Sequence, residues 1–139
     1  MNASEKARKD RKALDVFFGR LTKSLSDAGV SLLAGSDSGA FNSYTYPGES
    51  LHKEMEVMVN VGISPLKALQ TSAYNGALFF QKETHYGSVS DGKIADLVLL
   101  QANPLEDITN TQNIAYVIQG DVIHDKGKLK DLLENAVIP

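Results

Sequence analysis

The chain has 139 residues, of which 42% are hydrophobic and 22% are charged, and its formal net charge is −3. This balance is typical of a soluble globular domain, and it argues against a disordered protein and against a general nucleic-acid-binding protein. The absence of cysteine excludes disulfides, thiolate nucleophiles and thiolate metal ligands.

An amphipathic helix is predicted near the start of the chain, with Gly29 as its C-cap. Residues 1–28 carry seven basic and four acidic side chains, a net charge of +3, which leaves −6 for the remainder. Such a basic cluster is compatible with a nucleic-acid-binding arm, but the helical spacing of the apolar residues favours a solvated face of an amphipathic helix. These apolar residues are Leu14, Phe17, Phe18, Leu21, Leu25 and Ala28.

A buried parallel strand is predicted for the short apolar run from Val30 to Ala34. A helix followed directly by such a strand is typical of α/β proteins. Asp37 would then project from the carboxyl end of the strand, where open α/β sheets and barrels place their catalytic residues. Taken alone, an aspartate in the sequence "SDSG" is better explained as a cap or a turn acceptor.

Two helices are predicted next. Ser50 is expected to cap the first of them, which ends at Gly62. Ser64 caps the second, and Pro65 takes its first position, where no N–H donor is needed. The apolar faces of the two helices are Leu51, Met55, Met58 and Val59 in the first, and Leu66, Leu69, Ala73 and Ala77 in the second.

The periodicity changes from helical to strand-like after about residue 84. A turn at residues 91–92 precedes a strand over residues 94–100, in which Asp96 is expected to satisfy neighbouring backbone amides. Residues 115–124 form a hairpin candidate with a Gly-Asp turn, and a short helix is predicted to follow it.

Five segments occur in a characteristic order: "LLAGSDSG", "PGESLHKEMEVMVNVGISPLKALQTSAYNGA", "YGSVSDGKIADLVLL", "NPLEDI" and "IAYVIQGDVI". This order resembles the carboxyl-terminal part of the amidohydrolase superfamily, especially its imidazolonepropionase-like and Xaa-Pro dipeptidase-like metal-dependent hydrolases, over residues 14–127. The resemblance implies an α/β fold in which residues 1–82 are the last helix-strand-helix units of a TIM-type barrel. Residues 83–139 would contribute the carboxyl-terminal strands of a small β-sandwich and a terminal helix. A complete barrel needs about 250 residues, so we expect only part of the fold.

The resemblance implies that Asp37 is a metal ligand at the end of the eighth barrel strand and handles the proton of the attacking water. A divalent metal, zinc by this resemblance, lowers the pKa of bound water, and an adjacent carboxylate accepts the water proton. The complete form would hydrolyse the C–N bond of a small cyclic amide or a dipeptide. The implied substrate pocket includes Phe41, Tyr44 and Tyr46 of the following loop, and His52. A surface position of these aromatics, and a surface or capping role of His52, are the alternatives.

The histidines of the superfamily are missing. Its members carry a His-x-His sequence after the first strand, whereas this chain has only His52, His85 and His124, on three different predicted elements. A catalytic zinc site has about three protein ligands, of which Asp37 supplies one. We therefore expect the chain alone to bind no metal tightly and to be inactive.

Three classes of function remain open: the carboxyl-terminal portion of an amidohydrolase, a noncatalytic assembly module derived from that fold, and nucleic-acid binding by the basic helix. The first is favoured, with no nucleic-acid and no membrane partner. No apolar run is long enough to span a bilayer, and the first 15 residues lack the apolar core of a signal peptide, so a cytoplasmic location is predicted. Strands without neighbours expose backbone groups, which predicts self-association by strand pairing or exchange.

Overall fold

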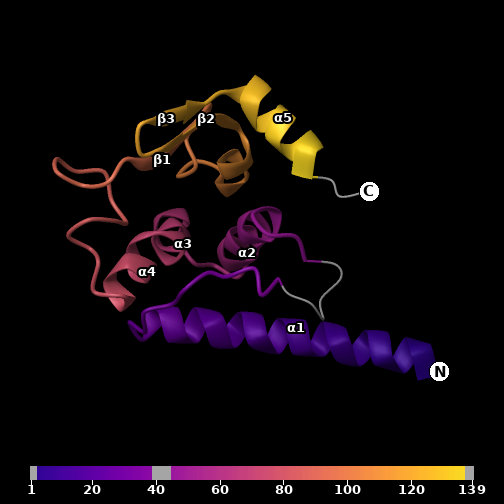
Figure 1. Ribbon diagram of the computed structural model, residues 1–139. Helices are drawn as coiled ribbons and strands as arrows, with labels where there is room; N and C mark the ends of the chain where they lie inside the picture. The colour runs from indigo at the N-terminus through magenta and orange to yellow at the C-terminus, as the bar shows by residue number, and fades with distance from the viewer. Residues whose placement is uncertain (1–2, 39–44, 137–139) are drawn as a thin grey trace.

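The computed structural model describes residues 3–38 and 45–136, which form three layers (Figure 1). Helix α1 (Ala3–Asp27) forms the first layer, and the extended segment 30–38 lies between it and the second layer. The second layer contains α2 (Glu49–Asn60), α3 (Pro65–Ser72) and α4 (Tyr74–Phe79). The third layer contains strands β1 (Asp96–Leu100), β2 (Ile114–Gln119) and β3 (Val122–His124), the 3-10 helix η1 (Ile108–Gln112) and α5 (Lys126–Ala136).

The core lies in the second layer, between the extended segment on one side and η1 on the other. The predicted inner stripe of α2 is confirmed, because Met55 and Met58 are buried there. In α3 the buried apolar residue is Ala68, whereas Leu66, predicted on the inner face, is 55% exposed. The buried cluster consists of Met55, Met58, Ile63, Ala68 and Ile108, with Leu32, Ala34, Leu51, Val59, Val61 and Leu69 packed against it.

The prediction of a strand from Val30 to Ala34 is wrong. The segment is extended, but it forms no ladder with another strand among the described residues. A β-strand is defined by hydrogen bonds to a neighbouring strand, and here the segment bonds to helices instead. The N–H of Ala34 donates to the carbonyl of Thr71 (3.0 Å), and the Asn75 side chain donates to the carbonyl of Leu32 (2.8 Å).

Several predicted helix boundaries are confirmed. Helix α1 is followed by Gly29 with φ of 80°, the left-handed conformation that a glycine C-cap adopts. The hydroxyl of Ser64 accepts a hydrogen bond from the N–H of Lys67 (3.4 Å), and Pro65 occupies the first position of α3. Both helix ends are set by residues within a few positions of the boundary, so they can be predicted from the sequence.

Two other helix predictions need correction. Helix α2 begins at Glu49 with Gly48 as its N-cap, because the hydroxyl of Ser50 accepts a hydrogen bond from the N–H of Tyr46 (2.9 Å) instead of capping the helix. The single helix predicted after Ser64 is two helices, α3 and α4. The backbone breaks between them at Ala73, where φ is −135°.

The sheet has the strand order β1-β2-β3, and both pairs are antiparallel. The predicted hairpin is confirmed, with Gly120 at φ of 60° in its turn. The first strand of the hairpin begins at Ile114, one residue before its predicted start. Strand β1 begins at Asp96, two residues after its own predicted start at residue 94. The carboxylate of Asp96 accepts a hydrogen bond from the N–H of Gly120 (3.1 Å), which confirms its predicted role toward backbone amides.

The connection from α4 to β1 is held together by Lys93. Its ammonium group donates to the carbonyl of Glu83 (2.6 Å) and to the hydroxyl of Ser88 (2.6 Å). Within this loop the backbone of Gly87 lies against α4, next to Ala77. The loop is therefore a fixed elbow rather than a free linker.

Helix α1 is the longest helix and lies along one side of the molecule, with its N-terminal half extending past the other helices (Figure 1). It is amphipathic as predicted, but its large apolar side chains are exposed. None of the helices within the described residues combines the length and the apolar composition that a bilayer-spanning helix needs.

We predict that Gly87→Ala destabilises the protein more than Gly92→Ala. Both glycines have positive φ, 85° and 81°, so alanine is strained at both positions, by about 1–2 kcal/mol. An added Cβ at Gly87 would lie 2.7 Å from Cβ of Ala77 and 3.0 Å from Cα of Tyr74, whereas no atom lies within 4 Å at Gly92. This crowding should remove a further ~1–3 kcal/mol of unfolding free energy, measured by urea denaturation. Equal losses in the two variants would contradict the packing of the elbow.

Candidate functional site

Asp37 lies just past the part of the extended segment that packs on the helices, and its side chain is exposed. Its φ of 48° is in the left-handed region, which aspartate and asparagine tolerate better than most residues. The hydroxyl of Ser36 accepts a hydrogen bond from the N–H of Ser38 (3.4 Å), and the two hydroxyl oxygens are 2.9 Å apart. The acceptor in this turn is therefore Ser36. No hydrogen bond or ion pair with a described residue engages the carboxylate of Asp37.

The position of Asp37 follows from how the segment packs. From residue 31 to residue 38, exposed and half-buried residues alternate. Leu32 and Ala34 pack against the helical core, whereas Leu33 and Asp37 are exposed. The segment thus places the carboxylate at the end of a packed stretch, open to solvent.

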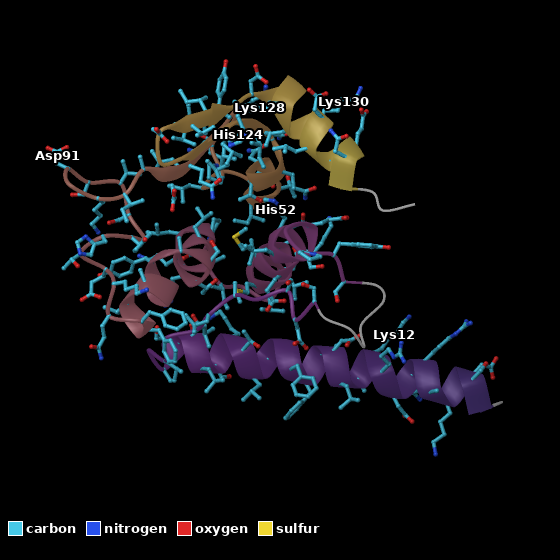
Figure 2. The ribbon with its side chains drawn as sticks, in the orientation of Figure 1. Lys12, His52, Asp91, His124, Lys128 and Lys130 are labelled. Carbon is cyan, nitrogen blue, oxygen red and sulfur yellow. The ribbon has the colours of Figure 1, made fainter. Side chains whose placement is uncertain are left out.

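The four predicted substrate-contacting residues have different outcomes. Phe41 and Tyr44 lie outside the described residues. Tyr46 precedes α2 and is 61% exposed, with its N–H bound to the hydroxyl of Ser50. His52 is half-buried on α2, and Figure 2 shows it between α2 and the layer above, next to η1. A role of these residues in substrate binding stays a prediction.

His52 joins α2 to η1. Its Nδ1 lies 3.0 Å from the hydroxyl oxygen of Thr111, and that hydroxyl donates to the carbonyl of Ile108 (2.9 Å). Since the Thr111 proton is used in this way, the oxygen accepts from Nδ1–H of His52. A second contact runs from the amide of Gln112 to the carboxylate of Glu56. This contact could not be predicted from the sequence, because η1 is too short to show a periodic pattern.

The described residues do not by themselves fit a divalent metal site. No group of three or more histidine, aspartate or glutamate side chains with suitable geometry occurs among them. His85 is exposed in the loop after α4, and His124 lies on β3, in a different layer from His52 (Figure 2). Nδ1 of His124 is buried and has no hydrogen-bond partner in the described structure. Asp37 therefore supplies one carboxylate, where a catalytic zinc site uses about three protein ligands.

A carboxylate with a shifted pKa lies at the start of η1. The hydroxyl and the N–H of Thr109 both donate to the carboxylate of Asp107, at 2.7 Å and 2.9 Å. These hydrogen bonds, the side-chain one first, lower the pKa of Asp107 below its usual value because they stabilise the charged form. The carboxylate caps η1, so the shift has a structural cause.

One cavity lies beside the extended segment, at the end opposite to Asp37. Its volume is about 220 Å³, and it is lined by the start of the segment, the end of α1 and helices α3 and α4. The ammonium group of Lys67 reaches across it toward the carbonyl of Ser26 (3.5 Å). Because this cavity is remote from Asp37, it is not part of the candidate site.

The chain matches known proteins in sequence. The model of the amidohydrolase family matches residues 5–129. The adenine deaminase of Desulforamulus reducens is 32% identical over 82 residues, and that of Clostridium botulinum (strain Loch Maree / Type A3) is 34% identical over 85 residues. These matches cover 58% and 57% of this chain, but only 13% of each deaminase.

The fold also resembles solved structures. An Xaa-Pro dipeptidase aligns with a TM-score of 0.68 and 29% identity over 77% of this chain, and a molinate hydrolase with 0.69 and 27% over 87%. The alignments use 25% and 27% of those two chains, so this chain spans about a quarter of the structures that it matches. The family match extends over most of the length of this chain, which confirms the resemblance seen in the sequence motifs. The chain belongs to the amidohydrolase family.

Proposed function

We propose that this chain supplies the carboxyl-terminal part of an amidohydrolase that hydrolyses a C–N bond in a small substrate. The observation that carries this proposal is the position of Asp37. Its carboxylate follows an extended segment, is exposed, and is engaged by no described residue. Such a free carboxylate can contribute to a site whose other residues come from other parts of the fold.

The proposed arrangement treats residues 1–82 as the last units of a TIM-type barrel and residues 83–139 as part of a small β-sandwich. The extended segment between α1 and α2 supports this, because it has the alternating burial of a strand without neighbouring strands. The coverage of about a quarter of the aligned structures is consistent with a chain that holds only part of the fold.

In this proposal Asp37 contributes one ligand to a divalent metal site, with zinc the expected ion. The remaining ligands come from outside the described residues, so the chemistry assigned to this chain is a proton transfer. The carboxylate of Asp37 accepts a proton from the attacking water and passes it to the leaving nitrogen. Phe41, Tyr44 and Tyr46 follow Asp37 within ten residues and are proposed to line the substrate side of the pocket.

The proposed substrate is a dipeptide or another small amide. The relatives include adenine deaminases as well as an Xaa-Pro dipeptidase, and both names denote enzymes that act on C–N bonds. The deaminase match covers 58% of this chain, whereas the dipeptidase alignment covers 77% of it. The structural likeness to the dipeptidase supports the amide substrate, and adenine is the alternative that the deaminase matches support.

A noncatalytic assembly module is the second candidate. It is favoured by one observation, namely that the described residues contain no set of three potential metal ligands. The two candidates differ in what they require of Asp37, since an assembly module has no use for an available carboxylate at this position.

We predict that the chain alone retains no stoichiometric zinc and shows no amidase turnover. One carboxylate without histidine partners cannot hold the ion against dialysis. The measurement is elemental analysis of the purified chain after exposure to zinc and dialysis, together with an assay on dipeptide substrates. One firmly retained zinc ion per chain would contradict the ligand count.

We further predict that Asp37 is essential once the fold is completed. The test is a polypeptide that joins this chain to the amidohydrolase segments that correspond to the remaining three quarters of the dipeptidase structure. There, Asp37→Asn should lower kcat by at least about 100-fold, because the amide cannot accept the water proton. Asparagine also tolerates the left-handed backbone at this position, so the fold should persist.

The matched control is Asp91→Asn, which removes an exposed carboxylate from the turn before β1, far from the extended segment (Figure 2). Its kcat should stay within about twofold of the unsubstituted protein, since surface substitutions away from a site have small effects. Full activity of the Asp37→Asn polypeptide would refute the assignment of the catalytic carboxylate and leave the assembly module as the better explanation.

A further inference from the structure

Two hydrogen bonds hold the extended segment against the helices α3 and α4. The N–H of Ala34 donates to the carbonyl of Thr71 (3.0 Å), and the side-chain amide of Asn75 donates to the carbonyl of Leu32 (2.8 Å). In an extended chain the backbone groups of residues two positions apart point to the same edge, so both bonds lie on one edge of the segment. We call these two bonds the segment clamp.

The break between α3 and α4 makes the segment clamp possible. In an uninterrupted α-helix the carbonyl of Thr71 would accept a hydrogen bond from the N–H of residue 75. The backbone breaks at Ala73, where φ is −135°, and this carbonyl accepts from Ala34 instead. Helix α4 then starts at Tyr74, and Asn75, its second residue, reaches the segment with its side chain.

Apolar packing alone does not fix where the segment lies along the helices. Leu32 and Ala34 are only half-buried, and contacts between apolar side chains have no preferred direction. The cavity of about 220 Å³ beside the start of the segment is lined by both Leu32 and Asn75, and it leaves room for the segment to shift. Hydrogen bonds are directional, so the segment clamp defines the position that packing leaves open.

The segment clamp is the last hydrogen-bonded attachment before Asp37. Within residues 35–38, no hydrogen bond joins the segment to another described element, because Ser36 and Ser38 bond only to each other. Asp37 follows Ala34 by three residues. A shift of the clamped residues is therefore passed on to Asp37.

We propose that Asn75 is a positioning residue for the carboxylate of Asp37. Its amide holds the carbonyl of Leu32, and the segment held in this way carries the carboxylate to its place. Asn75 thus acts through the segment and not on the reacting atoms. The catalytic part of this inference rests on the proposed function of Asp37, whereas the part that concerns the segment does not.

The decisive variants are Asn75→Ala and Asn75→Asp, with Asn110→Ala as their matched control. Alanine removes the donor together with its volume, and an ionised aspartate keeps the size but cannot donate, so the two variants share only the loss of the donor. Asn110 is half-buried like Asn75, and its amide donates to the carbonyl of Asn103 (3.0 Å) in the third layer. The control therefore loses a bond of the same kind that does not touch the segment.

The first experiment uses this chain alone and measures amide hydrogen exchange by nuclear magnetic resonance. Both Asn75 variants should raise the exchange rate of the Ala34 amide about fivefold or more, because one hydrogen bond fewer holds the segment. The amide of Ile63, which donates to the carbonyl of Met58 in the core, should change by less than about twofold. Asn110→Ala should leave both rates unchanged.

The second experiment uses the completed polypeptide, in which this chain is joined to the remaining amidohydrolase segments. Asn75→Ala should lower kcat about tenfold and change KM by less than about twofold, because a displaced carboxylate impairs proton transfer and not substrate binding. Adding Asn75→Ala to Asp37→Asn should lower kcat no further, since a residue that acts through Asp37 has no effect once that carboxylate is gone. A merely structural role would lower kcat by the same factor in both backgrounds.

Three results would overturn the proposal. An unchanged exchange rate of Ala34 in the Asn75 variants would mean that packing alone holds the segment. Equal acceleration at Ala34 and Ile63 would mean that Asn75 stabilises the whole fold. A further loss of kcat in the doubly substituted polypeptide would mean that Asn75 acts independently of Asp37.

The failure of the proposed function gives a different result. Full activity of the Asp37→Asn polypeptide would refute that function and, with it, the catalytic part of this inference. The exchange rates of the chain alone would still decide whether Asn75 holds the segment.

Discussion

The packing of Leu32 and Ala34 against the helical core is the contact on which the rest of the structure depends. These two side chains hold an otherwise unsupported extended segment against Met55, Met58 and their neighbours. The hydrogen bond from Ala34 to Thr71 fixes the segment along its length as well. Asp37 comes three residues after Ala34, where the backbone enters the left-handed region and the side chain is exposed. A hydrophobic contact therefore sets the place of the polar group in the fold.

The sequence predicted those features that depend on local chemistry. The end of α1 at Gly29 and the start of α3 at Ser64 and Pro65 follow from backbone conformations and hydrogen bonds within four residues. The hairpin turn at Gly120 belongs to the same class. Local chemistry could not decide whether residues 30–34 form a strand, because strand pairing depends on neighbours that are distant in sequence. None of the described residues supplies such a neighbour.

The sequence predicted part of the candidate site and missed the contacts between residues distant in the chain. Motif order was enough to select Asp37, but not to show that Ser36, one residue earlier, is the acceptor of the local turn. The place of His52 one turn into α2 suggests substrate binding. Its bond to Thr111 connects positions 59 residues apart. Such a contact between a helix and a 3-10 turn has no periodic signal in the sequence. The remaining ligands of a metal site are not among the described residues, so no reading of these residues could place them.

The contact between α2 and η1 uses two side chains of α2 that are four residues apart, His52 and Glu56. Residues with this spacing lie one turn apart on the same side of a helix. Their partners, Thr111 and Gln112, are neighbours on η1, which also buries Ile108 in the core. The third layer is therefore joined to α2 by redundant contacts, and loss of the imidazole of His52 alone would leave both the amide contact and the buried isoleucine in place.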